Sequence, residues 1–172
     1  MRRLKFVDES GVNLAMTRLY GRAPKGERVV GSVPQNYGQN VTVLAALGPQ
    51  GLQAMMTVEG ATDADVCRAD VKHGLGPTLA PGDIIVLDNL GAHKAVGIQQ
   101  MLARRRVRLL YLPPYSPDLA PIEPCWSKVN TSLRTAKART REALGTALSQ
   151  ALATVTAVDA CNWFRPCGYA LH

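Results

Sequence analysis

The strongest constraint on the fold of this chain is an unbroken apolar run at residues 84–87, IIVL. A strand with one exposed face alternates apolar and polar residues, whereas this run does not alternate, as expected for a central strand covered on both faces. Pro81-Gly82 marks a turn before the run, and Asp88 follows its last residue. The run therefore predicts a sheet with helices packed on both faces.

The remaining segments complete an α/β pattern. Strands are expected at 4–7, 41–47, 52–58, 84–87 and 107–112, and helices at 62–79, at 94–105, from about residue 121 onward, and within 141–164. The first strand is expected to end in a turn at 8–11, and Thr62 with Asp65 resembles a capping pattern for the helix at 62–79. An antiparallel group followed by alternating helices and strands predicts a mixed sheet flanked by helices.

Composition excludes several classes of protein. The chain has 172 residues, which suits one domain, and 47% of them are hydrophobic, which excludes an intrinsically disordered chain. No apolar run approaches the roughly 18 residues of a membrane span, and charges interrupt the N-terminal segment, so a cytoplasmic protein is expected. The four cysteines form no C-x-x-C pair and are interpreted as reduced, structural thiols.

The net charge of +7 is unevenly distributed. Residues 1–30 carry seven Lys and Arg against three Asp and Glu, and residues 101–141 carry nine against two. A concentrated positive surface favours polyanions, because each neutralised phosphate releases counterions. On charge alone, a solvated basic face without a partner is an equal alternative.

Three acidic residues stand at chemically suggestive places. Asp8 closes the expected first strand, Asp88 closes the central strand, and Glu123 lies in the first turn of the helix that begins near Pro121. Sites in open α/β sheets form beyond the carboxyl ends of strands, so neighbouring strands would bring Asp8 and Asp88 together. Clustered carboxylates repel unless a cation neutralises them, and Mg²⁺ prefers oxygen ligands. Each acid alone also has an ordinary structural interpretation, as a turn residue or a helix-dipole contact.

The helix that begins near Pro121 has two distinct faces. Its apolar stripe, which predicts a core contact, contains Ile122, Trp126, Val129 and Leu133. Its polar stripe, whose members are candidates for contact with a phosphate backbone, contains Glu123, Ser127, Asn130 and Arg134. We therefore interpret Trp126 as a core residue and expect Glu123 to lie outside the core.

Three strings carry a resemblance to a known family: FVDESG at 6–11, VLDNLGAHK at 86–94, and LYLPPYSPDLAPIE at 110–123. They resemble the DDE transposases of bacterial insertion sequences related to the mariner superfamily. In that family 34 residues separate the second Asp from the Glu, as residues 89–122 do here. The resemblance implies an RNase H-like α/β fold, with a mixed five-stranded sheet flanked by helices, in a single catalytic domain over 1–172.

The resemblance also implies a chemistry. Asp8, Asp88 and Glu123 would be the catalytic residues and would hold two divalent ions, natively Mg²⁺ with Mn²⁺ as a substitute. The substrate would be double-stranded DNA, both transposon ends and target, cut and rejoined by in-line attack at phosphodiesters. A homodimer is expected on the DNA, associated with the bacterial nucleoid. Family members carry helix-turn-helix modules before the first catalytic strand. Specific recognition of transposon ends is therefore expected to be either missing here or supplied by a separate helix-turn-helix chain.

Further residues are candidates for DNA contact. The loop GRAPKGER at 21–28 is expected near Asp8, where Arg22, Lys25 and Arg28 would face phosphates. Its glycine spacing matches a P-loop, but Glu27-Arg28 stands where Lys-Ser/Thr is required, which excludes that motif. Lys94 belongs to the second resembling string. His93 has two interpretations, as a contact to the scissile phosphate or as a capping and packing residue.

One departure from the family pattern supports alternative functions. The family usually has Asn where Ala120 stands, and the loss of a helix cap costs about 0.5–2 kcal/mol. Together with the missing helix-turn-helix module, this leaves a second hypothesis, a catalytically decayed or domesticated remnant that binds DNA without cutting it. A third hypothesis is another RNase H-like nuclease, acting for example on RNA–DNA hybrids.

Overall fold

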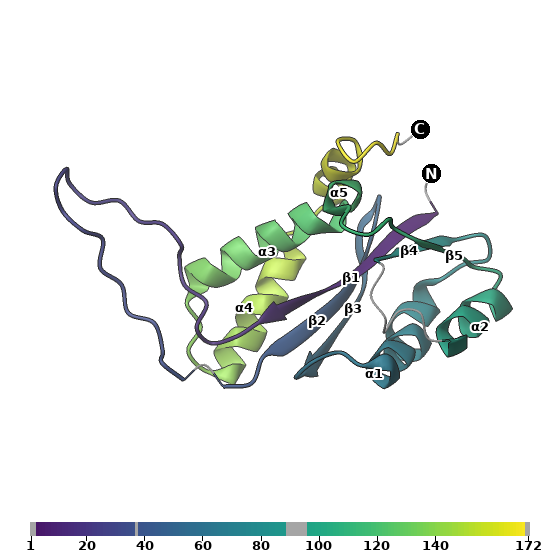
Figure 1. The fold of residues 1–172 in the computed structure, drawn as a ribbon, viewed down its shortest axis with the longest axis horizontal. Helices are drawn as coiled ribbons and strands as arrows, with labels where there is room; N and C mark the ends of the chain where they lie inside the picture. Colours follow the sequence, from purple (N-terminus) through teal and green to yellow (C-terminus); the bar gives the residue numbers. More distant parts are fainter. Residues whose placement is uncertain (1–2, 37, 89–95, 171–172) are drawn as a thin grey trace.

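The computed structural model describes residues 3–36, 38–88 and 96–170, and within these it contains a five-stranded sheet of order β3-β2-β1-β4-β5 (Figure 1). The strands are β1 (Leu4–Val12), β2 (Val41–Gly48), β3 (Gly51–Glu59), β4 (Ile84–Leu87) and β5 (Arg108–Tyr111). Strand β2 is antiparallel to β1 and β3, whereas β1, β4 and β5 are parallel. This is the mixed five-stranded sheet that the sequence predicts.

Helices cover both faces of the sheet, with α3, α4 and α5 on one and α1 and α2 on the other (Figure 1). Their bounds are α1 (Ala64–Ala69), the π-helical turn η1 (Asp70–Leu75), the short 3₁₀ turns η2 (Gly76–Thr78) and η4 (Pro117–Leu119), α2 (Val96–Arg104), α3 (Ile122–Ala136), α4 (Arg141–Ala153) and α5 (Ala157–Phe164). None of the helices described is long and apolar enough to cross a membrane.

The cap of the first helix differs from the expectation. Asp63, not Thr62, is the N-cap of α1, and its carboxylate accepts hydrogen bonds from the amides of Asp65 and Val66. The aspartate oxygen satisfies two amide donors that the first turn of a helix leaves unpaired. The helical segment expected at 62–79 is therefore correct in position, but α1 begins at Ala64, two residues later.

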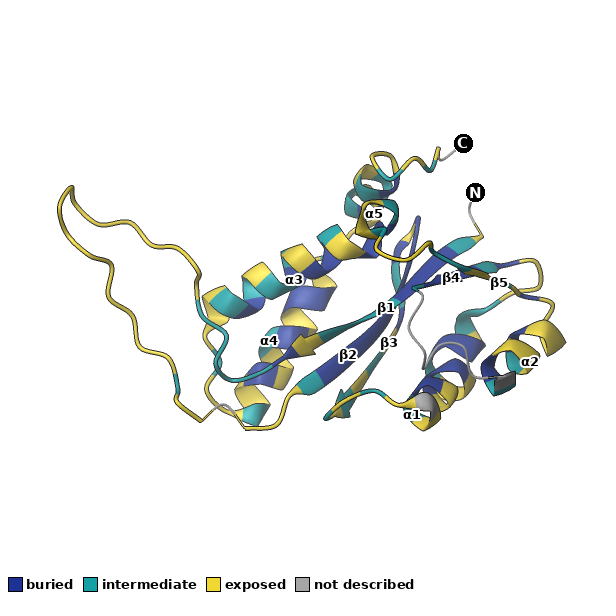
Figure 2. Cartoon of the chain, viewed as in Figure 1, coloured by how far each residue is buried: buried dark blue, intermediate teal, exposed yellow. Residues whose placement is uncertain are grey.

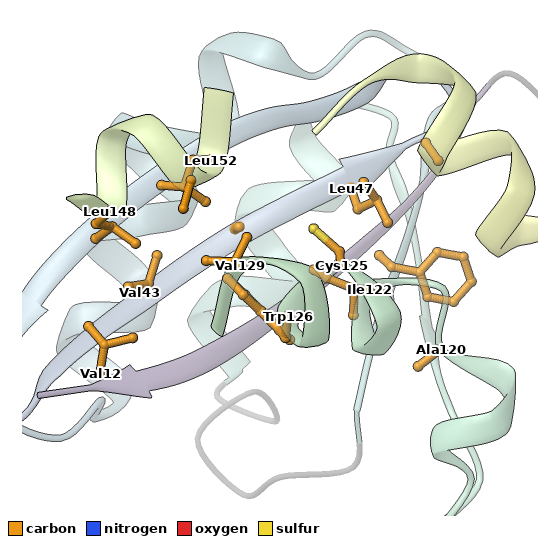
Figure 3. Close-up of a cluster of buried hydrophobic side chains, with 14 of the residues drawn as sticks. Val12, Val43, Leu47, Ala120, Ile122, Cys125, Trp126, Val129, Leu148 and Leu152 are labelled. Carbon is orange, nitrogen blue, oxygen red and sulfur yellow. The ribbon is translucent and has the colours of Figure 1, made fainter. Parts of the chain in front are cut away.

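The core lies in two layers, one on each side of the sheet. Alternate residues of β1 point to opposite faces, so that Phe6 belongs to the cluster beneath α3, α4 and α5, and Val7 to the cluster beneath α1 and α2. Val86 and Leu87 of β4 divide in the same way. Figure 3 shows the cluster around α3, which contains the whole apolar stripe of that helix. The unbroken run 84–87 thus reflects burial on both faces, as predicted.

Strand β1 is longer than the sequence suggests. Its parallel pairing with β4 stops at Val7–Leu87, but its antiparallel pairing with β2 continues to Val12–Val41. The expected turn at 8–11 is therefore wrong, and Asp8 lies inside β1, not at its end. Asp8 nevertheless lies one residue beyond the point where the pairing of β1 with the neighbouring strand β4 ends.

The described residues between β1 and β2, 13–36 and 38–40, form an extended arm that projects away from the sheet (Figure 1). The guanidinium of Arg139 donates to two backbone carbonyls at its base, over 2.7 and 3.0 Å, and residues 18–33 are all exposed (Figure 2). The expectation that the loop 21–28 lies near Asp8 is wrong. Strand β1 continues four residues beyond Asp8, roughly 13 Å, before the arm begins.

Candidate active site

One pocket, with a volume of about 460 Å³, is lined by all three acidic residues that the sequence singles out. Asp8 comes from β1, Asp88 follows β4 directly, and Glu123 lies in the first turn of α3. Val7 of β1 pairs with Leu87 of the neighbouring parallel strand β4. Asp8 and Asp88 each follow one member of this pair directly in the sequence. The fold therefore brings together three side chains that lie far apart in the sequence.

A proline-rich segment also lines this pocket. Residues 112–117, LPPYSP, line it, and their three prolines restrict the backbone because each ring fixes its own φ angle. Tyr115 has a φ of +56°, in the left-handed region that tyrosine rarely occupies, and its side chain is fully exposed. The wall is thus stiff, with an aromatic ring presented to solvent at its rim.

Asp8 lies in an environment that disfavours its charge. Burial raises the pKa of Asp8 from 3.8 to about 6; hydrogen bonds from the Glu9 backbone and the Trp126 indole oppose this rise, and the charges of Glu123 and Asp88 add to it. Desolvation and like charges both favour the protonated form of a carboxyl group. The raised pKa of Asp8 is therefore due mainly to burial, and the charges of Glu123 and Asp88 make a smaller contribution.

Trp126 has a role that the sequence does not predict. It is buried in the core, as expected, but its Nε1–H also donates a 3.0 Å hydrogen bond to Oδ2 of Asp8. The interpretation of Trp126 as a core residue alone is therefore incomplete. The chemistry of the side chain could have indicated this contact. A buried indole carries one N–H donor, which usually finds a hydrogen-bond acceptor.

The start of α3 does not depend on a side-chain cap. Its N-cap is Pro121, which supplies no capping hydrogen bond, while the amide of Glu123 donates to the carbonyl oxygen of Ala120 over 3.0 Å. Ala120 itself is 7% exposed and packs in the core cluster beside α3. A backbone turn thus begins the helix at the position where the resembling family usually has Asn.

The candidate DNA contacts have different surroundings. Ser127 is exposed on α3 and Arg134 is partly exposed one to two turns further along. Asn130 turns toward β1, where its Nδ2 donates to Oγ of Ser10 over 3.4 Å and its Oδ1 is buried without a hydrogen-bond partner. Three basic candidates lie exposed on the arm away from the pocket: Arg22, Lys25 and Arg28. His93 and Lys94 lie outside the described residues.

The donor set of the pocket suits a hard divalent cation, because it consists of carboxylate oxygens. As they stand, no three His, Cys, Asp or Glu side chains among the described residues converge tightly enough to enclose a metal ion. Like charges repel, and the charges of Glu123 and Asp88 contribute in part to the raised pKa of Asp8. A divalent cation would neutralise this repulsion and draw the three carboxylates together as it binds. The residues therefore fit a divalent metal ion.

A mixed sheet of this order has helices on both faces, one acidic pocket residue within β1 and another directly after β4, and it defines an RNase H-like domain with a carboxylate-lined pocket. The family model for the DDE superfamily endonucleases matches residues 3–145, and the chain belongs to this family. No curated protein matches the chain.

Solved structures of the Mos1 transposase have the same fold. Its paired-end complex with the left transposon end has a TM-score of 0.77 at 16% identity, over 96% of this chain and 51% of that chain. The Mos1 mariner paired end complex with Mn gives 0.77 at 17%, over 96% and 51%. The Mos1 catalytic domain gives 0.70 at 16%, over 96% and 76%. The RNase H-like fold expected from the sequence is confirmed, and the chain spans about half the length of the Mos1 chains in the complexes.

Proposed function

We propose that this chain is the catalytic domain of a DNA transposase, which cleaves and joins DNA strands by divalent-metal-dependent attack at phosphodiesters. The presence of Asp8, Asp88 and Glu123 in the lining of one pocket carries the proposal. The positions of these residues at two adjacent strands and one helix follow from the fold, and membership of the DDE superfamily endonucleases supports their catalytic role.

Four residues of the pocket have roles in this proposal. Asp8, Asp88 and Glu123 hold two Mg²⁺ ions, which Mn²⁺ can replace. When bound, such ions activate a water or hydroxyl nucleophile and stabilise the leaving oxygen of an in-line displacement. Glu123 is exposed on α3 and so is accessible to a phosphodiester arriving from solvent. The exposed ring of Tyr115 offers a surface on which a nucleobase can stack.

Double-stranded DNA is the proposed partner. The solved relatives include Mos1 transposase with a transposon end, and residues 101–141 of this chain carry a strong excess of positive charge. Such charge strengthens DNA binding in a salt-dependent manner. The proposal includes a homodimer on the DNA, a separate helix-turn-helix chain that recognises transposon ends, and action in the bacterial cytoplasm.

A plasmid-nicking assay tests the proposed function. The purified chain should convert supercoiled plasmid to the nicked form with Mg²⁺ or Mn²⁺ but not with EDTA, and Asp88→Ala should abolish nicking. Asp118→Ala is the matched control. Asp118 is exposed and directly follows the pocket residue Pro117 in the sequence, but it does not line the pocket. Binding of duplex DNA without any nicking would favour the decayed remnant. Cleavage of RNA–DNA hybrid in preference to duplex DNA would favour the other nuclease.

A further inference from the structure

The hydrogen bond between Trp126 and Asp8 joins residues 118 positions apart in the sequence. The indole is 4% exposed and lies within the core cluster, whereas the Asp8 carboxyl group lines the pocket. One side chain thus connects the interior of the domain to the candidate metal site. A buried N–H group keeps its acceptor, because no water replaces it.

A second polar contact joins the same two elements in the same register. Asn130, four residues after Trp126 on α3, donates to Ser10, two residues after Asp8 on β1. Four residues are about one helical turn and two residues of a strand return to the same face, so the two contacts are neighbours. Both lie beside an apolar interface, which by itself is not directional. A shift of α3 along β1 would break both hydrogen bonds.

This register matters because α3 also carries Glu123, three residues before Trp126. Residues three apart lie on neighbouring positions of a helix surface. The contact that holds Trp126 against Asp8 therefore also sets where Glu123 stands relative to Asp8. Partners that hydrogen-bond to metal ligands fix the orientation of those ligands and contribute to metal affinity.

We propose that Trp126 is a positioning residue of the metal site. Its indole N–H holds one oxygen of Asp8 and fixes α3 against β1, so that Asp8 and Glu123 face the same cation. This inference rests on the proposed function of the pocket as a divalent-metal site. If Trp126 only filled the core, its replacement by a smaller aromatic ring would change stability and leave metal affinity unchanged.

The first test follows the indole N–H resonances of the ¹⁵N-labelled wild-type chain by NMR. The chain has two tryptophans, and Trp163 on α5 packs against the same core cluster, which makes it an internal reference. Addition of Mg²⁺ should move the Trp126 resonance saturably and leave that of Trp163 in place. A Trp126 resonance that does not respond, in a protein that binds Mg²⁺, would overturn the inference.

The second test measures Mn²⁺ binding by electron paramagnetic resonance. Trp126→Phe keeps most of the ring volume but removes the N–H donor, and it should raise the Kd for Mn²⁺ by about 10–100-fold. Trp163→Phe is the matched control and should keep the wild-type Kd. A folded Trp126→Phe protein with the wild-type Kd would overturn the inference alone, whereas wild-type protein that binds no Mn²⁺ would contradict the proposed function as well. If Trp126→Phe does not fold, the NMR titration decides.

Discussion

Replacement of Asp8 by Asn is expected to stabilise the metal-free protein at pH 7.5 by about 2–3 kcal/mol, while it abolishes metal-dependent cleavage. Burial, reinforced by the two neighbouring acids, raises the pKa of Asp8 from 3.8 to about 6, so the folded state disfavours the ionised carboxylate. Asn has nearly the same shape without the charge, and its side-chain oxygen still accepts the hydrogen bond from Trp126. Function would thus depend on a residue that weakens the fold.

The dependence on pH gives this prediction its sign. Because the folded pKa of Asp8 lies above the unfolded value, its stabilising contribution is fully present below about pH 4 and is lost as pH rises through about 6. Urea unfolding in EDTA between pH 4 and pH 8 should show this loss in wild-type protein and not in Asp8→Asn. Asp118→Asn, at an exposed position, serves as the control. Identical pH profiles for wild type and Asp8→Asn would refute the prediction.

Mg²⁺ should reverse the difference in stability between wild-type protein and Asp8→Asn. A ligand that binds only the folded state stabilises it, and an ionised Asp8 is the form that binds a cation. At pH 7.5 Mg²⁺ should therefore raise the unfolding free energy of wild-type protein and leave that of Asp8→Asn unchanged. Below about pH 6 protons should compete with the ion, so the Mg²⁺ effect on wild-type protein should weaken there.

Replacement of Glu123 by Gln is expected to lower the nicking rate by more than about 100-fold. Loss of a residue that hydrogen-bonds to a metal ligand typically lowers activity by about 10–100-fold, and loss of a ligand itself should lower it further. The fold should be little affected, since Glu123 is exposed and its charge contributes about 0.3–1 kcal/mol at the start of α3. Glu142→Gln is the matched control, because Glu142 is also an exposed glutamate in a first helical turn, that of α4. Wild-type nicking by Glu123→Gln would remove Glu123 from the mechanism.

Sequence patterns predicted the parts of this fold that depend on local burial. The run 84–87 identified β4, an interior strand covered on both faces, and the apolar stripe of α3 identified the face that packs on the sheet. The positions of Asp8, Asp88 and Glu123 followed from the resembling strings, and the fold brings all three to one pocket.

Pairing between distant segments explains what the sequence did not show. Residues 9–11, Glu-Ser-Gly, have the composition of a turn, but antiparallel pairing with β2 keeps them in β1 and carries the arm away from Asp8. Helical periodicity placed Trp126 in the core correctly. It cannot show that an indole at the margin of that core reaches the carboxylate of an adjacent strand.

Anomalous diffraction from crystals soaked in Mn²⁺ tests the central claim most directly, because it locates the ions independently of any activity. The proposed function predicts two Mn²⁺ peaks in the pocket, with Asp8, Asp88 and Glu123 as ligands and the Trp126–Asp8 hydrogen bond retained. Mn²⁺ bound only at other acidic residues, with the three carboxylates unliganded, would contradict it.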